Sequence, residues 1–202
     1  MRAIIIGNGT ISNYTVMKQN AQKADIIICA DGGYRHAKKS GIIPDVVIGD
    51  FDSSSEPEDN ITKFVYPTKK DFTDGELCVK YACNHGCDEI IMFGMTGSRM
   101  DHTLTDMLLL IQCKNGCVID DNNEIYLLRN KFFIEGKKGM TLSIIPIGGD
   151  LSGIYTKGLE YSLNGETLYF GESRGNSNII IEDYCEIKAE NGIGFIIINN
   201  GE

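Results

Sequence analysis

Two aspartates separated by one residue, Asp50 and Asp52, are the side chains best placed for metal-dependent chemistry. They follow an apolar run at 46–48 that predicts a buried strand, which Gly49 ends. If the backbone stays extended beyond that glycine, the two carboxylates share one face and Phe51 points the other way. Their mutual repulsion is relieved by a divalent cation, and carboxylate oxygens at a strand end suit Mg²⁺. Taken alone, the segment is also compatible with a solvated acidic turn.

Acidic residues recur at the same place in the expected topology, directly after a predicted strand. Four successive strand-to-helix turns contribute Asp31, then Asp50 and Asp52, then Asp71 and Asp74, and finally Asp101. The carboxyl ends of parallel strands meet at one edge of a sheet, and α/β proteins bind their ligands beyond that edge. Scattered surface acids would not share this register, so the pattern predicts a single site.

Groups that suit a phosphate ligand occur in the same turns. The candidates are Gly32, Gly33, Lys70, Thr73, Arg99 and His102. The glycine pair allows close approach to the backbone, because no Cβ is in the way. Thr73 and Glu76 fit a capping box that would fix the direction of Asp74. Arg99 supplies a planar fork for phosphate oxygens.

The elements that must position these residues fall into two parts. Strands are predicted at 3–6, 26–30, 46–49, 63–66, 89–93, 117–119 and 125–128, and helices near 14–23, 34–39, 74–84 and 104–113. This alternation predicts an α/β domain over 1–129 with a mostly parallel, Rossmann-like sheet covered on both faces. From residue 130 only short β-rich runs remain, with turns expected at glycines such as Gly148 and Gly149. They predict an antiparallel β-sandwich over 130–202.

Composition excludes several classes of protein. The 202 residues are 42% hydrophobic and 23% charged, as in ordinary globular proteins. A net charge of −9 argues against nucleic-acid binding, and no apolar stretch is long enough to span a membrane. Seven cysteines, an odd number without a signal segment, predict reduced thiols and a cytoplasmic location. No Cys-x-x-Cys pair occurs, which argues against structural zinc.

Four motifs in order resemble the thiamine pyrophosphokinase family. They are Ala-Asp-Gly-Gly at 30–33, Pro-Asp-x-x-Ile-Gly-Asp-Phe-Asp-Ser at 44–53, Lys-Asp-x-Thr-Asp at 70–74 and Gly-x-Thr-Gly-x-Arg-x-Asp-His at 94–102. The resemblance continues through 158–163, 168–171 and 175–178, so it covers nearly the whole chain. The chain departs from the family pattern at Ser98, Asp106 and Ser162.

The resemblance implies a Mg²⁺-dependent transfer of pyrophosphate from ATP to the thiamine hydroxyl, which gives thiamine diphosphate and AMP. It further implies a catalytic, ATP- and Mg-binding α/β domain, a thiamine-binding and dimerisation sandwich, and a homodimer whose active site is shared between subunits. Implied metal ligands are Asp50, Asp52 and Asp74; implied catalytic residues are Arg99 and either Asp74 or Asp71 as base. ATP would contact Asp31, Gly32, Gly33, Lys70, Thr73, Arg99, Asp101 and His102, and thiamine would contact Asp52, Ser177 and Asn178. Because the chain has no Trp, a Tyr or Phe must stack on thiamine.

Other functions stay open at this point. One is a pyrophosphokinase for another heteroaromatic alcohol, such as a hydroxymethyl pterin. Another is a non-catalytic sensor of thiamine or nucleotide on the same fold, although a pure binder has no need of so many acids beside a triphosphate. A Mg²⁺-dependent nucleotide hydrolase is the weakest of the three.

Overall fold

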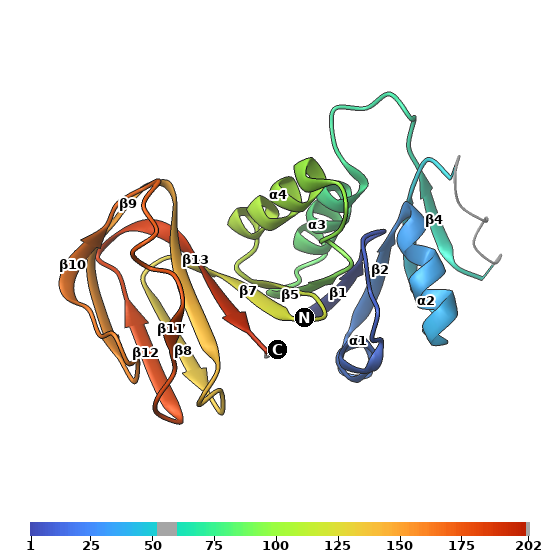
Figure 1. Cartoon of the computed structure of the whole chain (residues 1–202). Helices are drawn as coiled ribbons and strands as arrows, with labels where there is room; N and C mark the ends of the chain where they lie inside the picture. Colours follow the sequence, from blue (N-terminus) through green and yellow to red (C-terminus); the bar gives the residue numbers. More distant parts are fainter. Residues whose placement is uncertain (52–59, 201–202) are drawn as a thin grey trace. The chain divides into compact units, whose positions relative to one another are not determined.

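A computed structural model describes residues 1–51 and 60–200 of the chain (Figure 1). The chain divides into two compact units, Met1–Asp121 and Asn122–Glu202. Within the described ranges, no helix has the length and apolar character needed to cross a membrane.

A parallel sheet forms the centre of the first unit. Its strands, in spatial order, are β4 (Thr62–Val65), β3 (Val46–Gly49), β2 (Ile26–Ala30), β1 (Arg2–Ile6), β5 (Glu89–Phe93) and β6 (Asn115–Ile119). Every pair of neighbours runs parallel. The chain order reverses between β1 and β5, because the strands before β5 extend the sheet in one direction and β5 and β6 extend it in the other. A topological switch point of this kind is where open α/β sheets bind ligands.

Helices cover both faces of this sheet. They are α1 (Thr15–Ala21), η1 (Asp31–Gly33), α2 (Tyr34–Ser40), α3 (Asp74–Asn84), α4 (Met100–Leu108) and η2 (Leu109–Gln112). Right-handed crossovers place α1 and α2 on one face and α3 and α4 on the other, an arrangement that can be followed in Figure 1. The central strands are buried on both faces, which explains their nearly continuous apolar runs, such as Ile4, Ile5 and Ile6.

Helix boundaries in the first unit follow local sequence signals, with one correction. Gly41, at a φ of 75°, ends α2 as expected of a glycine C-cap. The helix expected over 104–113 instead begins at Met100, and its last turn tightens into η2. Asp101 and His102 therefore belong to the first turn of α4 rather than to the preceding loop.

The second unit is built from antiparallel strands. They are β7 (Asn123–Leu128), β8 (Lys131–Glu135), β9 (Thr141–Lys157), β10 (Asn164–Leu168), β11 (Asn178–Ile179), β12 (Tyr184–Lys188) and β13 (Asn191–Asn199). The long strand β9 pairs with β10, β11, β12 and β13, and β13 also pairs with β7. The turn expected at Gly148 and Gly149 is wrong, because both glycines lie inside β9. Their positive φ values of 71° and 154° bend the strand without ending it.

A separate hydrophobic core stabilises this unit. Its fully buried members come from strands far apart in sequence, among them Leu128, Leu142, Leu151, Ile187 and Ile196. The mostly parallel sheet followed by an antiparallel, many-stranded part agrees with the expectation from sequence. The apolar run at 125–128 was expected to belong to the α/β domain. It forms strand β7, which pairs with β13 in the second unit.

Candidate active site

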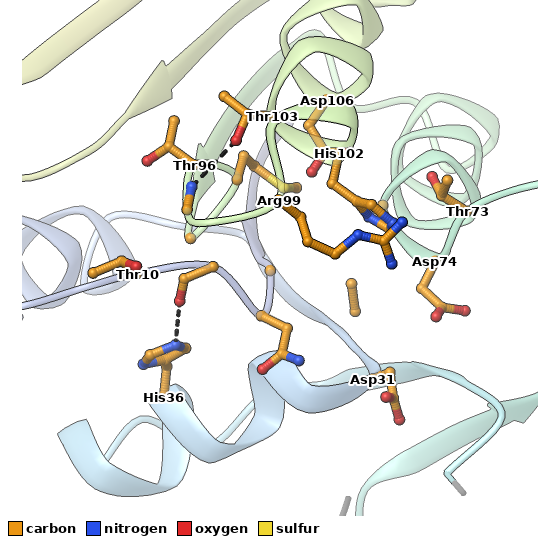
Figure 2. Close-up of a pocket in the computed structure, with 18 of the residues that line it drawn as sticks. Thr10, Asp31, His36, Thr73, Asp74, Thr96, Arg99, His102, Thr103 and Asp106 are labelled. Carbon is orange, nitrogen blue, oxygen red and sulfur yellow. Dashed lines mark hydrogen bonds between the residues drawn. The ribbon is translucent and has the colours of Figure 1, made fainter. Parts of the chain in front are cut away.

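A cavity of about 970 Å³ opens at the carboxyl ends of the parallel strands in the first unit. Its walls come from the loops after β1, β2, β3 and β5 and from helices α2, α3 and α4. Figure 2 shows Asp31, Thr73 and Asp74 at one end, with the Arg99 side chain extending toward them, and Thr10 and His36 at the other end. The cavity thus lies at the edge of the sheet where the strand-end acids were expected to meet.

The acidic end gathers carboxylates from neighbouring strands. Asp31 follows β2 with a φ of 36°, and a Cβ at Gly49 would lie 2.6 Å from the Asp31 Cβ. Glycine at the end of β3 therefore allows Asp31 to pack against that strand. Asp50 follows directly and also lines the cavity, whereas Asp52 lies outside the described residues.

The expectation of an extended backbone through Phe51 is wrong. Phe51 has a φ of 58°, in the left-handed region that a bulky side chain rarely adopts. The chain therefore turns immediately after Asp50. Backbone strain of this kind costs roughly 1–3 kcal/mol and often marks functional sites.

Asp74 is the carboxylate set deepest among the candidate catalytic acids. Lys70 Nζ lies 2.8 Å from Asp74 Oδ1 in an ion pair one helical turn apart. Burial raises the pKa of Asp74, and the negative charges of Asp31 and Asp50 raise it further, while Lys70 lowers it. A half-buried carboxylate with a raised pKa is suited to accept a proton near neutral pH.

The start of α3 fixes Asp74 in this position. The Glu76 backbone N–H donates to Thr73 Oγ1 at 3.1 Å, so the predicted Thr73 cap is confirmed. Asp71, the alternative base, is exposed and is not part of the cavity lining. The geometry therefore favours Asp74 over Asp71 as the general base.

Gly32 and Gly33 pack against the chain itself. Both are buried, and neither lines the cavity. A Cβ at Gly33 would lie 2.0 Å from the Ile6 carbonyl oxygen, and one at Gly32 would lie 2.5 Å from the Asn8 side chain. These glycines are required because the chain packs against its own β1 loop, which positions Asp31 and α2.

Arg99 and Asp101 form an exposed pair at the mouth of the cavity. Arg99 donates to both carboxylate oxygens of Asp101, at 3.2 and 2.5 Å. The hydrogen bond from Arg99 holds the pKa of Asp101 at about 2. Arg99 and His102 line the cavity, whereas Asp101 does not. Asp101 therefore restrains the Arg99 guanidinium at the entrance of the cavity.

The glycine-rich loop after β1 is a part of the wall that the sequence did not predict, and it packs against the loop after β5. The Gly9 N–H donates to the Gly94 carbonyl and the Thr10 N–H to the Thr96 carbonyl, each at 2.7 Å. A Cβ at Gly7 would lie 2.5 Å from the Gly94 carbonyl oxygen, so only glycine permits this contact. The Gly-x-Gly after the first predicted strand was the available signal.

The far end of the cavity also contains residues without a sequence assignment. Buried His36 on α2 donates from Nε2 to the Gly9 carbonyl at 2.9 Å, and the Tyr14 hydroxyl contacts Nδ1 at 2.9 Å. Burial lowers the pKa of His36, so the ring is neutral and the tyrosine hydroxyl donates to it. Arg35 and Lys39 add positive charge beside it. In the sequence, a lone histidine in a predicted helix did not indicate that His36 would line the cavity.

The candidate thiamine residues lie in the second unit. Asn178 uses its whole side-chain amide locally: Oδ1 accepts from the Tyr161 N–H at 3.0 Å, and Nδ2 donates to the Tyr161 carbonyl at 2.7 Å. Ser177, with a φ of 58°, donates its N–H to Ser143 Oγ at 3.1 Å. The two Asn178 contacts hold the backbone of Tyr161, whose ring is 66% exposed.

Comparison with known proteins identifies the relatives of this chain. A family model described as the thiamin pyrophosphokinase catalytic domain matches residues 17–126, and a second, described as the vitamin B1 binding domain, matches residues 129–193. Thiamine pyrophosphokinase of Bacillus subtilis is 32% identical over 78% of this chain and 79% of its own length. Thiamine pyrophosphokinase 1 of Oryza sativa is 24% identical over 85% of this chain and 78% of its own length.

Solved structures show the same fold over the whole chain. A crystal structure of thiamine pyrophosphokinase from Bacillus subtilis covers 100% of both chains with a TM-score of 0.87 at 26% identity. A thiamin pyrophosphokinase structure from Geobacillus thermodenitrificans covers 100% of this chain and 99% of its own, with a TM-score of 0.86 at 20% identity. With both family domains matched in order, the chain belongs to the thiamine pyrophosphokinase family.

Proposed function

We propose that the first-unit cavity performs the family reaction, with Asp74 as general base and the acids at the ends of β2 and β3 beside it. The chain is a thiamine diphosphokinase, which transfers pyrophosphate from ATP to the thiamine hydroxyl. The observation that carries the site assignment is the convergence of Asp31, Asp50 and Asp74, from three separate segments, on one cavity.

The roles follow from charge and position. Asp74 accepts the proton of the thiamine hydroxyl as its oxygen attacks the β-phosphorus, and AMP leaves. Lys70, which pairs with Asp74 and lines the cavity, exchanges this partner for a phosphate oxygen. Arg99 exchanges its bond to Asp101 for the phosphate chain as ATP enters. As in other phosphoryl transfers, positioning and electrostatics supply most of the rate acceleration.

The carboxylates of the cavity fit a magnesium ion. Among the described residues no three His, Cys, Asp or Glu side chains form a ready metal site. Mg²⁺ is commonly held by one or two carboxylates together with substrate phosphates, so Asp50 and Asp74 with Asp52 would suffice. Burial is the main cause of the raised pKa of Asp74, and the negative charges of Asp31 and Asp50 add to it; a cation relieves this repulsion. When bound, Mg²⁺ would neutralise charge on the phosphates.

The second unit supplies the thiamine contacts in this proposal. Because both ends of the Asn178 amide are engaged with Tyr161, Asn178 acts as a positioning residue. The exposed Tyr161 ring is then the aromatic surface offered to the pyrimidine of thiamine. We therefore propose that the antiparallel unit is a β-sandwich and that it binds thiamine through Ser177 and Tyr161.

A homodimer with a shared active site is part of the same proposal. One face of α4 and η2 exposes a stripe of large apolar side chains at helical spacing: Met100, Leu104, Leu108 and Ile111. A second copy of the chain would remove this stripe from water. We also propose a cytoplasmic location. All seven cysteines lie in the described part of the chain, and no disulfide joins them.

Leu108→Asp is expected to disrupt this dimer. Leu108 is 47% exposed in the single chain, so a carboxylate is tolerated there until a partner buries it. At micromolar concentration the variant should elute in size-exclusion chromatography near the 22.3 kDa monomer, while the parent chain elutes near twice that mass. Ile43→Asp, at a 73% exposed apolar position in the loop between α2 and β3, is the matched control and should stay dimeric. A Leu108→Asp variant that elutes with the parent would contradict the interface.

Acceptor competition tests the substrate assignment. Mg·ATP is offered with thiamine and with a hydroxymethyl pterin, separately and together, and both products are resolved by chromatography. Thiamine diphosphate is expected as the sole diphosphate ester. A pterin diphosphate would favour the other pyrophosphokinase, and binding of both ligands without AMP release would favour a sensor.

A further inference from the structure

Helix α4 presents a polar stripe to the cavity, on the face opposite its exposed apolar stripe. The stripe consists of Arg99, His102, Thr103 and Asp106, which are spaced three or four residues apart and all line the cavity. Exposure decreases along it, from 69% for the Arg99 side chain to 8% for Asp106. The stripe therefore leads from the cavity mouth to its floor.

Asp106 is a nine-tenths-buried carboxylic acid whose side chain has no hydrogen-bond or ion-pair partner among the residues that the structure describes. Its oxygen faces the first turn of α3: a Cβ at Gly75 would lie 3.1 Å from Asp106 Oδ1. Glycine at position 75 thus leaves room for the carboxyl and for a group beside it. A buried polar side chain costs free energy unless it is hydrogen-bonded, so the cavity floor is built for a polar partner.

The surroundings of Asp106 indicate which protonation state is present. Burial raises the pKa of Asp106 to about 7. The titratable groups around it are the buried Cys78 thiol and Asp74 on α3 and His102 one turn earlier on α4. Two cations that line the same cavity are engaged elsewhere, Lys70 with Asp74 and Arg99 with Asp101. With no cation paired to it among the described side chains, the carboxyl is mostly in its neutral, hydrogen-bond-donating form below pH 7.

We propose that Asp106 is a substrate-contacting residue whose neutral carboxyl donates a hydrogen bond to an oxygen of the nucleotide's polyphosphate. The inference rests on the proposed function of the same cavity. Arg99 and His102, higher on the stripe, are groups that bind anions. The N-terminal turn of the eleven-residue α3 lies opposite and directs backbone N–H groups and a positive dipole end toward the same space. A phosphate oxygen there would accept from the neutral Asp106 carboxyl and from the first turn of α3, whereas an ionised Asp106 would repel it.

The affinity for Mg·ATP should then fall as Asp106 ionises. The pKa of an acid that donates to a bound anion rises in the complex, so binding takes up a proton above pH 7. The dissociation constant of the parent chain should increase by up to about tenfold per pH unit above pH 7. Because only a variant at position 106 isolates the Asp106 carboxyl, the comparison of variants is decisive.

Equilibrium binding of Mg·ATP between pH 6.0 and 8.5 tests the proposal in the parent chain, Asp106→Asn and Glu135→Gln. The Asn amide donates at every pH, so Asp106→Asn should lose the component of the pH dependence that Asp106 contributes. Glu135→Gln removes one exposed carboxylate from β8 and should follow the parent. An unchanged pH dependence in Asp106→Asn, or an affinity that rises with pH in the parent chain, would overturn the proposal.

A second arm separates the phosphate chain from the nucleoside. Asp106→Leu removes the donor and should weaken Mg·ATP about tenfold at pH 6.5, while adenosine, measured by competition, should bind equally to both chains. Equal weakening of adenosine would place the contact on the nucleoside and overturn the polyphosphate assignment. Thermal unfolding confirms that the variant folds. Thiamine-dependent AMP release by the parent chain tests the proposed function separately, because it does not depend on the Asp106 result.

Discussion

Replacement of Asp74 with Asn is expected to lower kcat for thiamine diphosphate formation by at least ~100-fold. The amide keeps the shape of the side chain and cannot accept the hydroxyl proton or serve as an anionic metal ligand. Loss of a single preorganised group of this kind costs on the order of 100- to 1,000-fold in other enzymes. The KM for ATP should change far less than kcat, since Lys70 and Arg99 remain available to the phosphates.

Asp71→Asn is the matched control for this prediction. Asp71 lies three residues before Asp74 but is exposed and outside the cavity lining. Steady-state assays of both variants, each confirmed as folded by circular dichroism, should separate them by about two orders of magnitude. Near-parental turnover in Asp74→Asn, or a larger loss in Asp71→Asn, would show that the base has been assigned to the wrong carboxylate.

Replacement of Asp106 with Asn is expected to stabilise the fold increasingly as the pH rises. Burial raises the pKa of Asp106 from 3.8 to about 7, so the folded state holds a proton that the unfolded chain releases. Between these values the free energy of unfolding of the parent chain falls as the pH rises, and above pH 7 the loss is complete. The full effect is about 4 kcal/mol, of which roughly 2–3 kcal/mol falls between pH 5 and pH 8.

Urea unfolding of both chains at pH 5 and pH 8 measures this effect. Asn does not titrate, so the stability difference between Asp106→Asn and the parent should grow by roughly 2–3 kcal/mol between the two pH values. Subtraction of one chain from the other cancels every titration that they share. A difference that is the same at both pH values would mean that Asp106 ionises normally, and would also remove the physical basis of a neutral donor on the cavity floor.

The sequence predicted the elements that carry strong local signals. Buried parallel strands appear as apolar runs, and the acids that follow them had to converge at one sheet edge. Asp31, Asp50 and Asp74 were found in this way. The Thr73 cap followed from a capping box that depends only on four neighbouring residues.

Features that depend on tertiary contacts could not be predicted. In the sequence, Gly32 and Gly33 are compatible with close approach of a ligand. Only the folded structure shows that the segment after β1 packs against them and leaves no room for a Cβ. His36 and Tyr14 reach the cavity because α2 lies beside that loop, which no local pattern records. The length of β9 was underestimated, since Gly148 and Gly149 have the composition of a turn and pairing to other strands overrides it.

The fate of a label in the β-phosphate of ATP tests the central claim most directly. The chain is incubated with Mg²⁺, β-³²P-labelled ATP and thiamine, and the products are separated by chromatography. Attack at the β-phosphorus predicts that the label appears in thiamine diphosphate, with an equal amount of unlabelled AMP, and only when thiamine is present. Label recovered in ADP with thiamine monophosphate, or in inorganic pyrophosphate regardless of thiamine, would contradict pyrophosphate transfer at this site.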